Sequence, residues 1–178
     1  MLEPMIELPG VYLQPGELYL ARSPSLLKTL LGSCVGVTFW SPRLGIGALC
    51  HGVLPRCPDG VRDSEGYRYV DFAICHLIRQ LEGFGALPGE VQVKVFGGAD
   101  VLPVDIRRSS RATVGQQNCQ IALEILRREN YCILTSDMGG LTGRTIQFDT
   151  GSGVVLVRRL AGLSVGLMRP GIPGNVQS

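Results

Sequence analysis

The sequence predicts a single domain of the α+β class, mixed α/β with a mostly antiparallel sheet. Short apolar segments separated by turn residues make up most of the chain, as in sheet-rich folds. Glycine, with 24 of 178 residues, is nearly twice as frequent as its usual share of roughly 7%, which favours many tight turns. Only two segments have helical spacing, so the order is strands, helix, strand, helix, strands. A doubly wound nucleotide-binding fold would instead alternate strands and helices regularly.

The N-terminal part of the domain contains three predicted strands. Residues 1–16 form an extended lead-in with several prolines, and strands are predicted at 17–22, 26–40 and 45–54. Gly32 and Ser33 interrupt the second strand. The connection SPRLG, 41–45, has proline early and glycine late, as short hairpin turns often do. We therefore expect residues 35–40 to pair with residues 45–51.

The remaining elements include both predicted helices. A polar, turn-rich loop at 57–66 precedes a helix within 67–85, where apolar residues recur at helical spacing and Gly83 suits the C-terminal end. Further elements are predicted as a strand at 91–96, a helix at 113–129, a strand at 131–137, a hairpin of 144–149 with 154–160, and a last strand at 162–168. The domain is expected to span residues 17–170, followed by a tail at 171–178.

Charge and hydropathy exclude several classes of function. Seventeen basic and fifteen acidic residues give a net charge of +2, too little for a nucleic-acid-binding face. The basic cluster Arg107, Arg108 and Arg111 is predicted to be a solvated loop, with contact to an acidic partner as the alternative. No apolar stretch reaches 18 residues, and the N-terminus lacks a secretory signal, so we expect a cytoplasmic protein without membrane insertion.

The six cysteines indicate a reducing compartment, where thiols stay free. They contain no C-x-x-C pair. A zinc site could be assembled from Cys50, His51, Cys57, Cys75 and His76, but their spacing is poor for zinc, and a packing role on the first helix suits His76 better. The prediction is therefore that no metal is bound.

Cys34 and His51 are the candidates for covalent chemistry. A cysteine becomes a nucleophile when a neighbouring group, usually a histidine, removes its proton. Cys34 follows the Gly32-Ser33 break, and the predicted hairpin would bring it to the same edge as His51. The alternative, that Cys34 fills the core and His51 is a hydrogen-bonded strand residue, remains open from pattern alone.

Two glycine-rich loops, GGAD at 97–100 and GGLTGR at 139–144, are candidates for a binding surface. Neither matches a phosphate-binding P-loop or a dinucleotide-binding fingerprint. Loops whose bare backbone lines the rim of a pocket explain them better. The predicted substrate-binding residues are Gly32, Ser33, Gly97, Gly98, Gly139 and Gly140.

The motifs TLLGSCVGVTFWSP, GIGALCHGVLP, VKVFGGAD, DMGGLTGRTIQFD and GVVLVRRL resemble the CheD family in sequence and in order. This resemblance covers about residues 17–160, and its most specific part is the spacing from GSC to H-x-x-LP together with the GGA loop. One departure is VGQQN, 114–118, where many members have a glycine-glutamate-arginine-asparagine run. Gln116 and Gln117 are neutral, so no charge-based function is expected of this segment.

The resemblance implies a protein-glutamine deamidase of bacterial and archaeal chemotaxis. In that interpretation Cys34 is the nucleophile, His51 takes its proton to give a thiolate–imidazolium pair, and activity stays flat across neutral pH. The family also has a threonine that orients the histidine. Its usual position, six before the cysteine, is Lys28 here, and Thr29 is the candidate because no other threonine precedes Cys34.

The resemblance also implies a three-layer α/β/β sandwich, similar to the catalytic domain of cytotoxic necrotizing factor toxins. No cofactor is expected. The implied substrates are methyl-accepting chemotaxis receptors, and a CheC-type phosphatase is a further candidate partner. An alternative function is an adaptor that binds receptors and CheC with little catalysis of its own.

Overall fold

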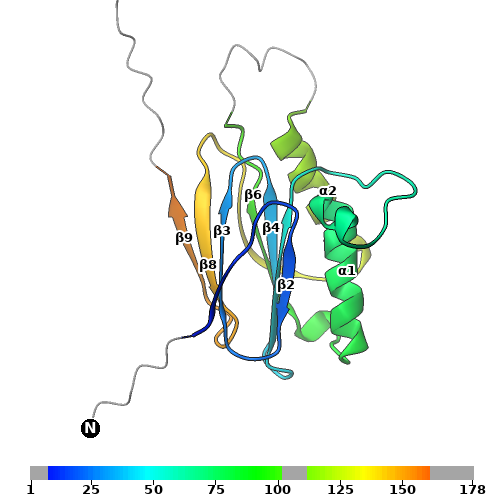
Figure 1. Cartoon of the computed structure of the whole chain (residues 1–178), viewed down its shortest axis with the longest axis vertical. Coiled ribbons are helices and arrows are strands. Elements are labelled where there is room, and N and C mark those ends of the chain that lie inside the picture. The colour runs from blue at the N-terminus through cyan, green and yellow to red at the C-terminus, as the bar shows by residue number, and fades with distance from the viewer. Residues whose placement is uncertain (1–7, 102–111, 161–178) are drawn as a thin grey trace, which may run out of the picture.

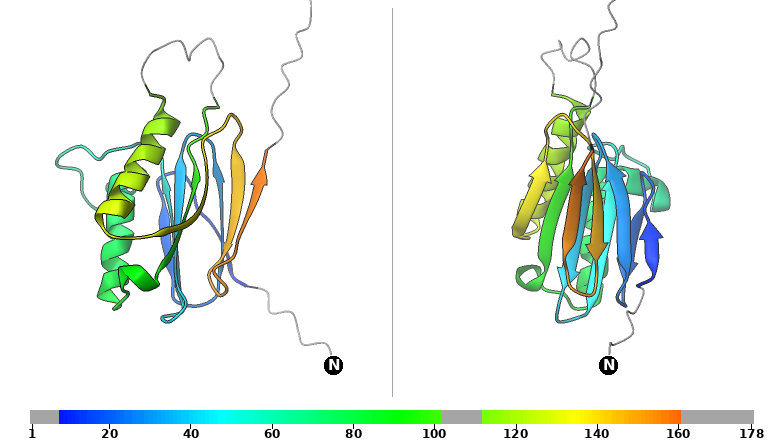
Figure 2. Two further views of the ribbon diagram at one scale, coloured as in Figure 1. Left: turned by 180° about the vertical axis from the view of Figure 1, so that it is seen from behind. Right: turned by 90° about the vertical axis from the view of Figure 1, so that its left-hand side faces the viewer.

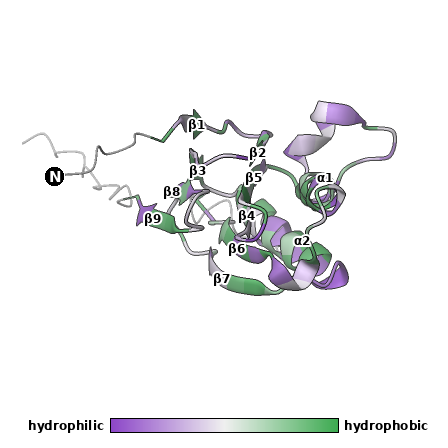
Figure 3. Ribbon diagram, turned by 90° about the horizontal axis from the view of Figure 1, so that it is seen from below, coloured by the Kyte–Doolittle hydropathy of each residue, from purple (hydrophilic) through white to green (hydrophobic). Residues whose placement is uncertain are grey.

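The computed structural model describes residues 8–101 and 112–160, which form three layers. Two helices cover one face of a five-stranded sheet, and a four-stranded sheet packs on its other face (Figure 1). The view from below separates the helices and the two sheets most clearly (Figure 3). The predicted α/β/β sandwich is confirmed.

The four-stranded sheet has the order β1-β3-β8-β9. Its strands are β1 (Gly10–Tyr12), β3 (Leu26–Leu31), β8 (Arg144–Asp149) and β9 (Val155–Arg159). Only the β1–β3 pair is parallel; the others are antiparallel. β1 lies within the predicted lead-in, residues 1–16, so part of that lead-in forms an edge strand of this sheet.

The five-stranded sheet has the order β2-β5-β4-β6-β7. Its strands are β2 (Leu18–Ala21), β5 (Ile46–Gly52), β4 (Val35–Ser41), β6 (Gln92–Gly97) and β7 (Ile133–Met138). The predicted β4–β5 hairpin forms, with Val35 opposite Gly52 and Gly36 opposite His51. Only the β6–β7 pair is parallel. The mostly antiparallel character predicted from the sequence is therefore confirmed.

The helices α1 (Val70–Gly83) and α2 (Val114–Arg128) lie at the predicted positions, and two short 3-10 helices occupy Asp63–Arg68 and Pro88–Glu90. At the start of α2, Thr113 and Gln116 form a reciprocal capping box. The residue after α1 that takes the left-handed conformation is Gly85, with φ +84°, two positions beyond the glycine expected to end the helix.

Two apolar cores hold the layers together. The larger lies between the helices and the five-stranded sheet, and it includes the predicted helical stripes. The smaller lies between the two sheets and contains Leu13, Leu27, Leu31, Leu49, Phe96, Ile146 and Phe148. Cys34 and His51 face this inter-sheet layer, so its side chains form their surroundings.

The break at Gly32-Ser33 carries the chain from one sheet to the other. β3 ends at Leu31 in the four-stranded sheet, and β4 begins at Val35 in the five-stranded sheet. The left view of Figure 2 shows the two sheets edge-on, as separate layers that the chain crosses between β3 and β4. Cys34 is the last residue of the crossing and therefore lies at the open end of the sandwich.

Some predictions fall outside the described residues. These are the basic cluster Arg107, Arg108 and Arg111, the strand at 162–168 and the tail at 171–178. The domain bounds also stay a prediction. Among the described residues, no helix is long and apolar enough to cross a membrane.

Candidate active site

His51 lies near the end of β5 and faces the layer between the sheets. Its cross-strand partner is Gly36, and a Cβ atom at that position would touch the side chains of Leu31 and Ile146 in the inter-sheet core. Residues directly opposite in a sheet point to the same face. His51 therefore points into the same closely packed layer, and it is only 1% exposed.

Thr29 of β3 reaches His51 across the gap between the sheets. Its Oγ1 atom lies 2.7 Å from His51 Nδ1 and 2.8 Å from the carbonyl oxygen of Leu13. A carbonyl can only accept, so the hydroxyl must donate its one proton to Leu13. It then accepts from His51, which fixes the proton on Nδ1 and leaves the lone pair on Nε2.

The Nε2 atom of His51 is buried and has no hydrogen-bond partner among the described residues. Burial lowers the pKa of the ring to about 4, although the Leu13 carbonyl and the Glu17 carboxylate partly oppose this shift. At neutral pH the imidazole is thus uncharged, correctly oriented and free to take a proton.

Cys34 lies on the same face of the sheet as His51. Residues two apart share a face of a strand, so the side chain of Cys34 points to the same face as position 36. It packs against the inter-sheet core. Position 34 and position 51 are diagonal neighbours across the β4–β5 pair. The structure contains no hydrogen bond between the two side chains. Such contacts are often long in free enzymes and shorten when substrate binds.

The Cys34 thiol is partly exposed, so it is not sealed in the interior. Burial raises its pKa, and its own backbone N–H opposes that shift. A thiol with a raised pKa beside an imidazole with a lowered pKa is uncharged at neutral pH. Burial of both groups therefore favours an uncharged pair over the expected thiolate–imidazolium pair, because neither charge would be well solvated there.

The two glycine-rich loops are joined to each other and to the chain around Cys34 by backbone hydrogen bonds. The amide of Gly98 donates to the carbonyl of Cys34 at 2.7 Å, and the amide of Ala99 donates to Gly32 at 2.8 Å. The second loop joins the first through bonds from Gly139 to Gly97 and from Asp100 to Gly140, both 2.8 Å. The predicted substrate-binding residues thus lie in one group of connected loops.

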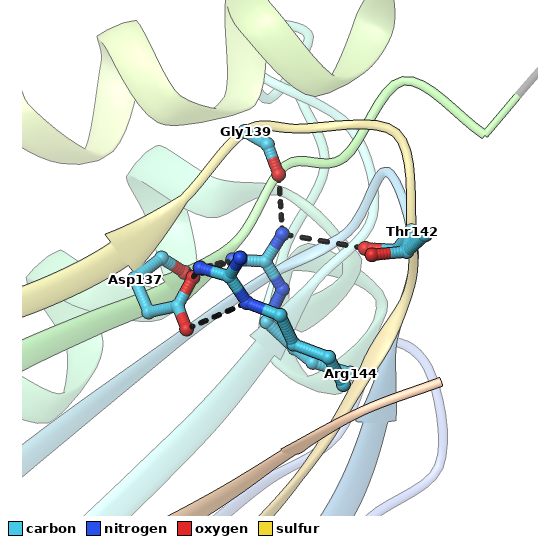
Figure 4. Close-up of polar contacts among 5 residues, drawn as sticks. Asp137, Gly139, Thr142 and Arg144 are labelled. Atoms are coloured by element: carbon cyan, nitrogen blue, oxygen red, sulfur yellow. Dashed lines mark hydrogen bonds and ion pairs between the residues drawn. The ribbon is translucent and has the colours of Figure 1, made fainter. Parts of the chain in front are cut away.

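Arg144 anchors the second of these loops, 139–143, from inside the protein. Its guanidinium is 2% exposed and donates to the carboxylate and carbonyl of Asp137 and to the carbonyls of Gly139 and Thr142 (Figure 4). Arg159 adds a second, exposed ion pair to Asp137. The ion pair compensates for burying the Arg144 charge, and the three carbonyls fix the loop's shape.

Comparison with known proteins identifies relatives over most of the chain. The family model described as "CheD chemotactic sensory transduction" matches residues 53–159. This chain belongs to the CheD family. It is 41% identical over 154 residues to "Probable chemoreceptor glutamine deamidase CheD 2" of Geobacter sulfurreducens, covering 86% of this chain and 92% of that protein.

Two further CheD relatives have similar coverage. The "Probable chemoreceptor glutamine deamidase CheD" of Maridesulfovibrio salexigens is 36% identical, covering 84% of this chain and 91% of its own. The protein of the same name in Pseudomonas syringae pv. tomato is 38% identical, covering 83% and 88%. The family-model match begins after Thr29, Cys34 and His51, so the roles of these three in this CheD chain rest on their geometry.

The zinc alternative does not fit the CheD structure. Cys50 is buried in the helix-side core, whereas His51, the next residue of β5, faces the other sheet. His76 contacts Tyr67 through a 3.3 Å hydrogen bond. Within residues 8–101 and 112–160, no three His, Cys, Asp or Glu side chains are grouped as metal ligands would be.

Asn118 of α2 is a site residue that the sequence reasoning missed. Its Nδ2 atom donates to the carbonyls of Ser33 and Val53, each at 2.9 Å, and the side chain is fully buried. The charge of the VGQQN run gives no indication of this role. A polar residue among the buried positions of a helix was the available signal.

Gly98 is packed far more closely than a residue at an open rim. A Cβ atom there would lie 2.0 Å from Cys119 Sγ and 2.9 Å from the carbonyl of Gly115, and its φ is +64°. A side chain at Gly98 would therefore disturb the packing of the domain and not only the contact with substrate. Replacement of Gly98 by alanine should lower the free energy of unfolding by about 2–4 kcal/mol.

The matched control for Gly98 is Gly89, which has open space around it and an ordinary φ. In urea denaturation, Gly89→Ala should stay within about 0.5 kcal/mol of the parent protein. Equal stabilities for the two variants would contradict the packing argument. A Cβ atom at Gly140 would meet only Arg144 Nη2, at 4.0 Å, but its φ of +77° still favours glycine.

The uncharged resting state of Cys34 predicts how fast the thiol reacts at different pH values. Alkylation by iodoacetamide requires the thiolate, so its rate at Cys34 should rise about tenfold per pH unit between pH 6 and 9. Peptide mass spectrometry follows Cys34 separately from the other five cysteines. A rate that is already constant between pH 6 and 8 would show a preformed ion pair instead.

Proposed function

We propose that this CheD protein hydrolyses the side-chain amide of specific glutamines in methyl-accepting chemotaxis receptors, giving glutamate and ammonia. The observation that carries the proposal is the Thr29–His51 hydrogen bond, which leaves the Nε2 lone pair of His51 free on the face where Cys34 lies. The names of the CheD relatives support the substrate class.

The first half of the reaction forms a thioester. His51 Nε2 takes the proton of the Cys34 thiol as the sulfur attacks the amide carbon of glutamine. The carbonyl oxygen becomes an oxyanion while the carbon is tetrahedral. The C–N bond then breaks, and His51 returns the proton so that ammonia leaves. The Thr29 hydroxyl accepts from Nδ1–H throughout and stabilises the imidazolium that forms transiently.

The second half releases the product. His51 Nε2 takes a proton from water, and the resulting hydroxide attacks the thioester carbon. The C–S bond breaks, and the thiolate of Cys34 recovers the proton from His51. The product is a glutamate side chain, and the net reaction adds one water and loses one ammonia. These steps use only side chains of this chain and require no metal or organic cofactor.

An oxyanion donor is available at Cys34 itself. The N–H group of Cys34 donates to no other residue in the described part of the chain, and its contact with the Cys34 sulfur lowers the thiol pKa. A backbone donor beside the nucleophile is the usual way to stabilise a tetrahedral oxyanion, and losing one costs roughly 10²–10³ in rate. We assign the Cys34 N–H to this role.

The rim of the site suits a protein substrate. Val101 and Leu141 are 47% and 63% exposed on the two loops beside the Cys34 crossing. Cys34 lines neither of the two cavities beside α2, of about 400 and 210 Å³. A shallow surface with apolar side chains at its edge can receive a glutamine that projects from a receptor helix.

The proposal is tested by incubating the protein with a purified receptor cytoplasmic fragment. Mass spectrometry should find a gain of about one dalton at particular glutamines, time-dependent and absent without the protein. No gain at any glutamine would contradict the enzyme and favour the adaptor alternative. The same proposal includes binding of a CheC-type phosphatase, which calorimetry can measure. The cytoplasmic location stays a prediction.

A further inference from the structure

Asn118 connects the two chain segments that carry the nucleophile and the base. Its Nδ2 donates to the carbonyl of Ser33, directly before Cys34, and to the carbonyl of Val53, two residues after His51. Both neighbours are carbonyl oxygens, which only accept, so the amide must present its NH₂ group to them. One buried side chain of α2 therefore holds both segments.

The bond to Ser33 also sets the direction of the Cys34 amide. The Ser33 carbonyl and the Cys34 N–H belong to one planar trans peptide, so they point in opposite directions. With the carbonyl held toward α2 by Asn118, the N–H points away from α2. It is the same N–H that contacts the Cys34 sulfur and donates to no other of the described residues.

We propose that Asn118 is a positioning residue that holds the Cys34 N–H as the oxyanion donor and fixes the β5 end beside it. This inference rests on the proposed deamidase reaction. The Oδ1 atom of Asn118 is buried without a donor in the described part of the chain. An unpartnered buried oxygen destabilises the fold, and a residue that only filled space would avoid that cost.

The experiment compares Asn118→Ala and Asn118→Asp with the exposed control Gln120→Ala on the same helix. With a receptor fragment as substrate, kcat should fall roughly 10²-fold in Asn118→Ala, while KM changes less than about threefold. Alkylation of Cys34 by iodoacetamide should fall far less than kcat, because it depends on the N–H only through the thiol pKa and forms no oxyanion. Gln120→Ala should match the parent in all three measurements.

The aspartate variant supplies a readout that a structural role would not affect. A buried carboxyl group facing two carbonyls has a raised pKa, and only its protonated form can donate to one of them. The kcat of Asn118→Asp should therefore rise as pH falls toward 5, whereas the parent stays flat. This variant keeps the shape of asparagine, so it also serves if Asn118→Ala fails to fold.

Three results separate the inference from the proposed function. Variants with parental kcat and a flat pH profile would overturn the role of Asn118 while leaving the deamidase intact. A loss of Cys34 alkylation equal to the loss of kcat would also overturn it, because the defect would then lie in the thiol or the fold. A parent protein that deamidates no receptor glutamine would overturn both.

Discussion

Replacement of Cys34 by alanine is expected to lower receptor deamidation by at least about 10⁴-fold. The sulfur forms the covalent bond of the thioester, and no other group described near His51 can replace it. The remaining rate should not exceed the rate at which glutamine deamidates in the buffer without enzyme. The measurement is the appearance of the one-dalton mass gain in a receptor fragment, with enzyme in excess of substrate so that slow turnover is still detected.

The control for Cys34 is Cys132→Ala, which removes the exposed cysteine of the described residues and should leave the rate unchanged. Cys34→Ala should keep the parental melting curve within a few degrees, because the residue is only partly buried at the end of the sandwich. Substantial deamidation by folded Cys34→Ala would rule out the cysteine mechanism.

Replacement of His51 by asparagine is expected to lower kcat/KM by roughly 10²–10⁴-fold at pH 7. The asparagine amide can donate to Thr29 much as Nδ1–H does, but it has no counterpart of Nε2 and cannot take the thiol proton. The remaining activity should rise about tenfold per pH unit up to pH 9, because the variant depends on spontaneous ionisation of Cys34, whose pKa is raised.

The parent protein should show the opposite pH behaviour. Its imidazole has a pKa lowered to about 4, so the base is lost only when pH falls below about 5, and kcat/KM should be flat from pH 5.5 to 8. The variant Thr29→Val keeps the imidazole but removes the hydroxyl that selects the tautomer of His51. Its kcat/KM should therefore fall less than that of His51→Asn, by about tenfold. Identical pH profiles for the parent and His51→Asn would disprove the role of His51 as base.

Much of the fold was predictable because its signals are local. The apolar spacing from Val70 to Leu81 defined α1, and the SPRLG turn defined the β4–β5 hairpin. That hairpin by itself places position 34 and position 51 on one face and at one edge. Each of these inferences depends only on residues a few positions apart, where the periodicity of helix or strand determines the direction of a side chain.

Other features had no local signal. The division into two sheets was not visible, because alternation shows which face of a strand is buried but not which sheet covers it. The tight packing of Gly98 against Cys119 likewise depends on how α2 docks, and the role of Asn118 depends on two carbonyls 85 and 65 positions away in the chain.

The sequence by itself predicted the α+β class and the family, and it singled out Cys34 and His51 as candidates, since motif order and short-range spacing carry that information. Only the tertiary structure indicated the tautomer of His51, the pKa shifts of His51 and Cys34 and the connection of both segments to α2. The physical reason is that proton positions and pKa values depend on burial and on partners from other layers. Thr29 reaches His51 only because the chain crosses between sheets at Gly32-Ser33.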